Sequence, residues 1–96
     1  MFITGYIREQ NITHILIDGG SAINIMPKTT MKLLGIAMKE LTRSHLMIQG
    51  FNQGGQQVIG MIRLELVTGE LSSNTLFHGI DAKTSYNILL ERPWLH

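Results

Sequence analysis

Runs of β-branched and aromatic residues separated by polar breaks dominate the chain, and they predict strands more often than helices. Two such runs open the sequence, at 2–8 and 12–18. The polar residues between them, Glu9, Gln10 and Asn11, suit a tight turn. We therefore expect the chain to begin as a β-hairpin.

One short helix is expected in the first half of the chain. After a Gly-Gly-Ser break the apolar pattern resumes at 23–25, and Pro27 suits the first position of a helix. Its apolar residues include Leu33 and Leu34, and Gly35 provides a stop. The pattern predicts a helix of about two turns.

A second, longer hairpin is expected in the middle of the chain. Apolar and polar positions alternate at 45–51 and again at 57–67. The segment between them, Asn-Gln-Gly-Gly at 52–55, tolerates positive φ. The sequence therefore predicts a hairpin with a glycine-rich tip.

The last third of the sequence also predicts strands. A turn at 68–69 leads into a run at 71–80, and the apolar run at 86–90 is typical of a strand buried on both faces. With 96 residues, the chain has room for a single domain over 1–96. The expected fold is mostly β, with one clear helix.

An internal repeat relates two ten-residue segments at an offset of 63. The segment 17–26, IDGGSAINIM, lies over the segment 80–89, IDAKTSYNIL, without a gap. Ile, Asp, Asn and Ile match outright, and most other positions match in size or chemistry. Each copy predicts an apolar strand that ends in Asp, a four-residue loop and a second buried strand. Chance similarity is the alternative, but the gapless spacing favours two related halves.

Composition excludes several classes of protein. Hydrophobic residues make up 44% of the chain and charged residues 16%, which excludes a disordered chain. The net charge is +1 with no basic run, so we expect neither a nucleic-acid partner nor binding to an anionic membrane. With no apolar run of spanning length and no cleavable leader, the chain is expected to be soluble and intracellular.

No cofactor or metal is expected. The chain has no cysteine, which excludes disulfides, thiol catalysis and cysteine zinc sites. The histidines at 14, 45, 78 and 96 lack the spacing of metal ligands. The pair Gly54 and Gly55 is not followed by the Lys-Ser or Lys-Thr of a phosphate loop.

Asp18 is the strongest candidate for chemistry. It ends an apolar run and precedes two glycines that leave the amides of the loop accessible. A carboxylate there is expected to be partly desolvated and hydrogen-bonded by main-chain N–H groups. An Asp before Gly-Gly is more often a turn residue than a catalyst, so its meaning depends on context.

The order of four motifs supplies that context. ILIDGGSAINIMP is followed by a helix ending in LLGI, by IQGF with a hairpin leading to IGMIRLEL, and by FHGIDAKTSYNILLERPWLH. Over almost the whole chain this order resembles the retropepsin-like aspartic protease domain of plant gypsy-class retrotransposon polyproteins. The resemblance implies a small closed β fold with an internal pseudo-twofold repeat, a symmetric homodimer and one catalytic Asp in each subunit.

The resemblance also assigns roles to residues. It places the catalytic carboxylate at Asp18 and a flap at about 48–60 that covers a peptide substrate. The active-site loop is then Gly19, Gly20, Ser21 and Ala22, and the flap residues expected to contact substrate are Ile48, Phe51, Gly54, Gly55, Val58 and Ile59. The implied activity is that of an aspartic endopeptidase that cleaves its own retroelement polyprotein in the cytoplasm.

Peptide hydrolysis by carboxylates needs two Asp groups that share one proton, and aspartic proteases are the standard case. A twofold axis would bring Asp18 of two chains together. Asp81, in the second copy of the repeat, is the alternative within one chain. It lacks a following Gly-Gly, since Ala82 and Lys83 come next, so we expect it to bind the amides of its own loop.

Three departures from the family pattern motivate a second hypothesis. Gly19 stands where the family commonly has Thr or Ser, and Glu91 stands where it usually has Gly. Relatives also continue beyond His96 into a further helix and strand that help to build the dimer. The alternative is therefore a catalytically inactive relic, or a domesticated binding or dimerisation module.

Overall fold

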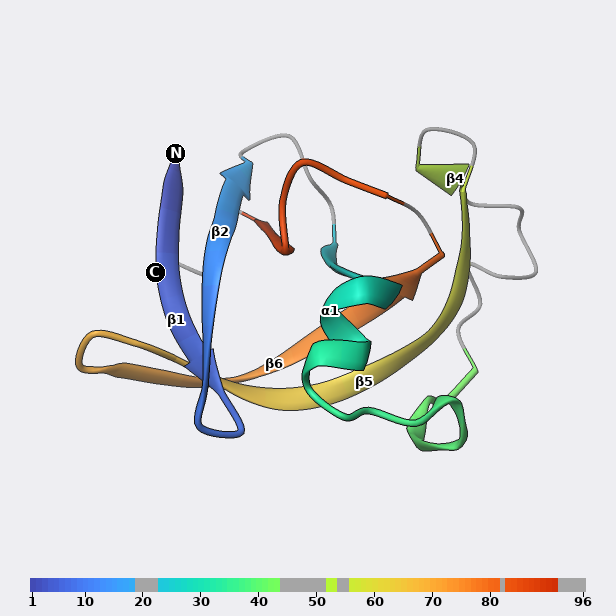
Figure 1. Cartoon of the computed structure of the whole chain (residues 1–96), viewed down its shortest axis with the longest axis horizontal. Coiled ribbons are helices and arrows are strands. Elements are labelled where there is room, and N and C mark those ends of the chain that lie inside the picture. The colour runs from blue at the N-terminus through green and yellow to red at the C-terminus, as the bar shows by residue number, and fades with distance from the viewer. Residues whose placement is uncertain (19–22, 44–51, 54–55, 82, 92–96) are drawn as a thin grey trace.

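The computed structural model describes residues 1–18, 23–43, 52–53, 56–81 and 83–91. Seven strands, one short α-helix and one 3-10 helix lie within these ranges (Figure 1). They are β1 Phe2–Ile7, β2 Gln10–Asp18, β3 Asn24–Pro27, α1 Lys28–Leu33, η1 Met38–Glu40, β4 Asn52–Gln53, β5 Gln56–Thr68, β6 Leu71–Ile80 and β7 Ile88–Glu91. Neither helix in these ranges is long and apolar enough to cross a membrane.

Six of the strands form one closed barrel. The strand order is β1-β2-β7-β3-β6-β5-β4, and a further pairing of Tyr6 with Val67 joins β1 to β5, so β4 lies outside the barrel and pairs with β5. Gly5 makes this closure possible, because a Cβ atom there would lie 2.8 Å from the carbonyl oxygen of Val67. The predicted class, a mostly β closed fold with one short helix, is confirmed.

The first hairpin forms as predicted, but its turn lies earlier. The turn residues are Arg8 and Glu9, with φ of 50° and 66°, whereas the sequence pointed to 9–11. Positive φ at both positions is typical of a type I′ turn, whose twist matches that of the flanking strands. Asn and Gly suit that conformation best, and their absence from positions 8 and 9 concealed the turn.

A bulge keeps the core face of β2 continuous. His14 has a φ of 54°, and the register with β1 shifts at this point, from Ile3 opposite Ile15 to Gly5 opposite Ile12. Strand side chains normally alternate between faces, so residues three apart would point in opposite directions. The extra residue of the bulge lets both Ile12 and Ile15 point into the core, where both are fully buried.

The helix and the later turns fall close to their predicted places. Pro27 is the N-cap of α1 and the last residue of β3, so the helix begins at Lys28, one residue later than expected. Gly35 follows the helix with a φ of 71°, the conformation expected of a glycine stop. β4 pairs with the start of β5, so Asn52 and Gln53, which were expected in the tip of the hairpin, are part of a strand. The rest of the expected tip, 54–55, and the expected partner strand at 45–51 fall outside the described residues.

The register of the central strands confirms the 63-residue repeat. In the parallel pair β2 and β7, Ile15 lies opposite Ile88. In the parallel pair β3 and β6, Ile25 lies opposite His78. Moving each member of the first pair by 63 residues, forward for Ile15 and back for Ile88, gives the second pair. The two copies are therefore related by a pseudo-twofold axis, with β3 and β7 antiparallel beside it.

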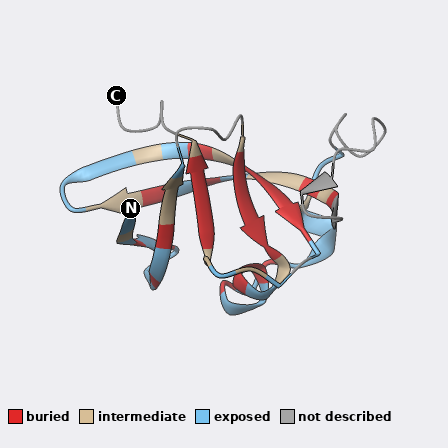
Figure 2. Ribbon diagram, turned by 90° about the horizontal axis from the view of Figure 1, so that it is seen from above, coloured by how far each residue is buried: buried red, intermediate tan, exposed pale blue. Residues whose placement is uncertain are grey.

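Two apolar clusters lie on opposite faces of the central strands. Figure 2 shows these strands as mostly buried, in red. The first cluster fills the barrel and includes Met31 and Leu34 from the helical segment. The second cluster consists of Ile25, Val58, Ile80 and Leu89. Strand β7 contributes to both, because Ile88 and Leu90 belong to the first cluster and Leu89 to the second. This confirms the prediction of a strand buried on both faces.

Candidate active site

Asp18 is the last residue of β2 and is exposed in the single chain. The partial burial expected from the sequence is therefore not present in the single chain. Asp18 is the register partner of Glu91, the last residue of the adjacent parallel strand β7. The loop residues Gly19, Gly20, Ser21 and Ala22 lie outside the described residues.

The side chain of Asp18 belongs to the face of the sheet that carries the second cluster. Side chains two residues apart on a strand share a face, so Asp18 points to the same side as Leu16. Leu16 packs against the second cluster, as do Ile23 and Tyr86. These three side chains are only partly buried, so the carboxylate stands beside an apolar surface.

Asp81 lies at the opposite end of the central strands from Asp18. It follows β6, just as Asp18 ends β2, but β7 and β3 separate these two strands. Because β7 and β3 are antiparallel while the outer pairings are parallel, β2 and β6 run in opposite directions. The ends that carry Asp18 and Asp81 therefore point away from each other. The two carboxylates of one chain cannot form a catalytic pair.

A buried residue close to the end of β2 was not predicted from the sequence. The side chain of Asn24, at the start of β3, accepts a hydrogen bond from the main-chain N–H of Glu91 at 2.8 Å. The signal in the sequence is the identity of Asn24 with Asn87 in the repeat.

Comparison with known proteins identifies the architecture. No family model and no curated protein matches the chain. Among solved structures, the retroviral protease-like domain of Ddi1 from Leishmania major aligns over 99% of this chain and 74% of that chain, with a TM-score of 0.79 and 17% identity. A retropepsin-like aspartic protease from Rickettsia conorii aligns over 98% and 68%, with a TM-score of 0.71 and 18% identity.

The chain has a retropepsin-like fold. The alignment covers nearly the whole chain, so the similarity concerns the barrel and not one motif within it. In this retropepsin-like fold, Asp18 ends the first strand of the first repeat copy.

The proposed flap residues of the retropepsin-like domain are described only in part. Val58 is buried in the second cluster, on the face that carries Asp18. Ile59 is half-buried and packs against the first cluster, so it points to the other side of β5. The remaining flap positions predicted from the sequence, Ile48, Phe51, Gly54 and Gly55, lie outside the described residues.

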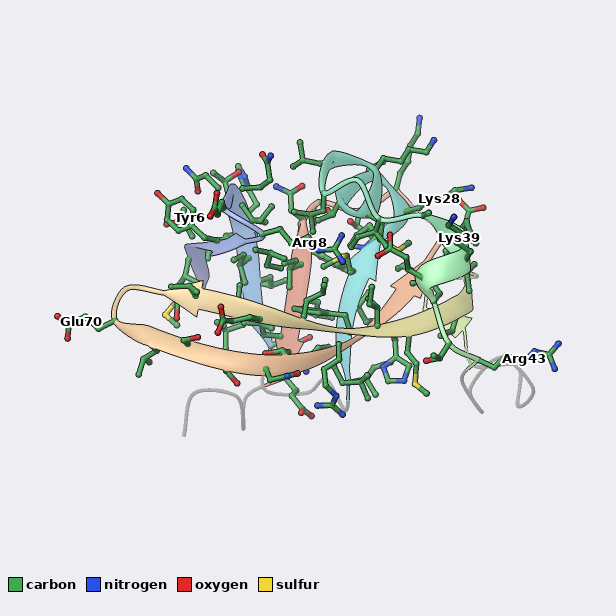
Figure 3. The ribbon with its side chains drawn as sticks, turned by 90° about the horizontal axis from the view of Figure 1, so that it is seen from below. Tyr6, Arg8, Lys28, Lys39, Arg43 and Glu70 are labelled. Carbon is green, nitrogen blue, oxygen red and sulfur yellow. The ribbon has the colours of Figure 1, made fainter. Side chains whose placement is uncertain are left out.

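A separate hollow of about 580 Å³ lies at the other end of β2 from Asp18. It is lined by Tyr6, Arg8, Glu9, Glu65 and Val67. Figure 3 shows Tyr6 on β1 and Arg8 just after this strand. Arg8 is already engaged in an ion pair with Glu40 at 3.1 Å. This hollow is not part of the site around Asp18.

The described residues of the retropepsin-like domain contain no group of three or more His, Asp or Glu side chains that could hold a metal ion. Burial raises the pKa of Tyr86, which packs beside the second cluster. Burial lowers the pKa of His78, whose Nδ1 atom has no hydrogen-bond partner among the described residues. Both side chains are therefore neutral near pH 7.

Proposed function

We propose that this protein is an aspartic endopeptidase that acts as a homodimer, with Asp18 of each chain as the catalytic carboxylate. The observation that carries the proposal is the position of the two repeat aspartates. Asp18 ends β2 on an apolar face of a retropepsin-like fold, and Asp81 lies at the opposite end of the central strands. A pair of neighbouring aspartates therefore requires a second chain, related by a twofold axis near Asp18.

The proposed chemistry follows from such a pair. Two carboxylates close together share one proton, because both cannot be ionised at that distance. The ionised Asp18 accepts a proton from the attacking water, and the protonated Asp18 of the other chain donates its proton to the carbonyl oxygen of the scissile peptide. As the C–N bond breaks, the Asp18 that took the proton of water donates it to the leaving amine, while the other Asp18 takes a proton back from a hydroxyl of the tetrahedral intermediate, so the pair again holds one proton.

The proposed substrate is an extended polypeptide, and we propose a retroelement polyprotein that contains this domain, processed in the cytoplasm. Leu16, Ile23 and Tyr86 are partly buried apolar side chains on the Asp18 face. They suit apolar side chains of a peptide laid across that face. The flap proposed at 48–60 would add strand-like main-chain hydrogen bonds from the other side.

The decisive experiment compares two aspartate variants. A fluorogenic peptide library is incubated with the native chain from pH 4 to pH 7, and the mass of the active species is measured. We expect cleavage by a dimer, loss of cleavage in Asp18→Asn and retention in Asp81→Asn. Cleavage by Asp18→Asn, or cleavage by a strict monomer, would contradict the proposal.

One observation favours a second candidate function, a catalytically silent dimerisation module. Glu91 places a second carboxylate in register with Asp18. In a twofold dimer this puts four carboxylates close to the axis, which opposes formation of a productive pair. An inactive native dimer at every pH, together with cleavage by the Glu91→Gly variant, would support the dimerisation module. It would also show that the fold itself can support catalysis.

A further inference from the structure

A buried asparagine joins three strands beside Asp18. Asn24 is only 7% exposed. Its Oδ1 atom accepts a hydrogen bond from the main-chain N–H of Glu91 on β7 at 2.8 Å, and its Nδ2 atom donates to the carbonyl oxygen of Leu76 on β6 at 3.2 Å. Since Asn24 itself begins β3, a single carboxamide connects β3, β7 and β6.

These bonds lie at the base of the connection that carries Asp18. The chain leaves β2 at Asp18 and enters β3 at Asn24, and β7 is the strand between β2 and β3. The last residue of β7, Glu91, is the register partner of Asp18 on one side and the hydrogen-bond donor to Asn24 on the other. The main chain of Glu91 therefore contacts both ends of the connection, because it is paired with Asp18 at one end and bonded to Asn24 at the other.

The second copy of the repeat provides an internal comparison. Asn87 donates from Nδ2 to the carbonyl oxygen of Thr13 at 2.7 Å, which is the counterpart of the bond from Asn24 to Leu76 at the same 63-residue offset. The residue that corresponds to Glu91 is Lys28. Within the described ranges, its N–H group makes no bond to the side chain of Asn87.

The bond to the terminal strand residue is thus specific to the copy that contains Asp18. Loss of the Asn24 carboxamide would leave the N–H of Glu91 and the carbonyl of Leu76 without their partner, and buried unpaired groups are costly. The strand end at Glu91 would then be free to shift, and Asp18 with it. Catalysis by paired carboxylates is sensitive to such displacement, because a misplacement of about 1 Å can reduce a rate by about 100-fold.

We propose that Asn24 is a positioning residue for Asp18, acting through the main chain of Glu91. The proposal rests on the function proposed above, because the rate it controls is that of the Asp18 pair. Asn24 does not touch the substrate. Its role is to fix the strand end that stands beside the catalytic carboxylate.

The test uses the symmetry of the molecule. Asn24→Ala and Asn87→Ala each remove a carboxamide that bonds an equivalent carbonyl, but only the first releases Glu91. We expect Asn24→Ala to lower kcat about 10- to 100-fold with KM within about threefold. Asn87→Ala should keep kcat within about threefold at a temperature where both variants remain folded. Equal losses of kcat in the two variants would overturn the proposal.

A second measurement needs neither activity nor a variant. Hydrogen exchange of the native chain should show the N–H of Glu91 protected to a degree similar to that of Leu90, which lies within the ladder. Exchange of Glu91 at the rate of an unprotected amide would refute the positioning role even if Asn24→Ala fails to fold. Failure of the proposed function has a different signature, since cleavage would then be absent in the native chain or persist in Asp18→Asn.

Discussion

Asp18 and Glu91 lie directly opposite each other at the ends of two parallel strands, so that two carboxylates occupy neighbouring positions at one edge of the sheet. Like charges in register across a strand pair are destabilising, by about 0.2 to 1 kcal/mol. We expect Glu91→Gln to stabilise the fold by about 0.5 kcal/mol in thermal or urea unfolding at low ionic strength and pH 7.

The matched control is Glu70→Gln, because Glu70 is exposed at the tip of the β5–β6 hairpin (Figure 3). That variant should leave the unfolding free energy nearly unchanged. The gain from Glu91→Gln should shrink in about 1 M salt, where exposed charges are screened. A gain that is independent of salt would argue against repulsion between the two carboxylates.

The first turn stores conformational strain that a single substitution can remove. Glu9 has a φ of 66°, and the left-handed conformation costs a residue with a Cβ atom about 1 kcal/mol. We expect Glu9→Gly to raise stability by about 0.5 to 1 kcal/mol, with a rise in Tm of a few degrees. Glu9→Ala removes the same charge but keeps the Cβ atom. It should therefore give no such gain, and an equal gain would assign the effect to charge.

Because His78 is buried, we expect the fold to lose stability in mild acid. Burial lowers its pKa, and protonation would create an Nδ1–H group with no acceptor in the described structure. The unfolded chain binds the proton below about pH 6.5 and the folded chain does so only at lower pH, so folding stability decreases as pH falls through this window. His78→Leu should flatten the dependence of unfolding free energy on pH between about 6.5 and 5. An unchanged slope would contradict the role of this imidazole.

Gly5 controls closure of the barrel. A Cβ atom at this position would lie 2.8 Å from the carbonyl oxygen of Val67 and 2.9 Å from Cγ2 of Thr68. We expect Gly5→Ala to destabilise the fold by about 1 to 3 kcal/mol, because one of the contacts is with main chain and cannot move aside. Thr4→Ala, on the exposed side of the same strand, should change stability by no more than about 0.5 kcal/mol. Similar effects of both variants would show that the contact at Gly5 is relieved elsewhere.

Much of the fold could be predicted because local signals were strong. A β-branched run predicted β2, alternation predicted β5, and a run after the turn at 68–69 predicted β6, each to within a few residues. The repeat anticipated the pseudo-twofold relation of β2 and β3 to β6 and β7. The turn at Arg8 and Glu9 was misplaced because neither residue favours positive φ. The pairing of Ile7 with Gln10 leaves a two-residue loop, and such a loop forces a conformation that local preferences oppose.

The site was predicted less completely, and for a different reason. Asp18 stood out because a carboxylate after an apolar run is unusual, but its neighbours depend on strand order, which local patterns do not encode. The position of β7 between β2 and β3 places Glu91 opposite Asp18. It also brings the main-chain N–H of Glu91 within bonding distance of Asn24. The outright match of Asn24 with Asn87 in the repeat was the signal that could have identified this contact.

The interleaved order of the central strands also determines when the protein can assemble during synthesis. β2 cannot pair with β7 until residues near 91 have been made, although Ile15 is synthesised 73 positions before its partner Ile88. At typical translation rates that interval is roughly 4 to 15 seconds. Throughout it, the apolar residues of β2 have no partner on that side and are exposed to chaperones and to other nascent chains. The strand end that carries Asp18 is therefore completed only as β7 joins the sheet.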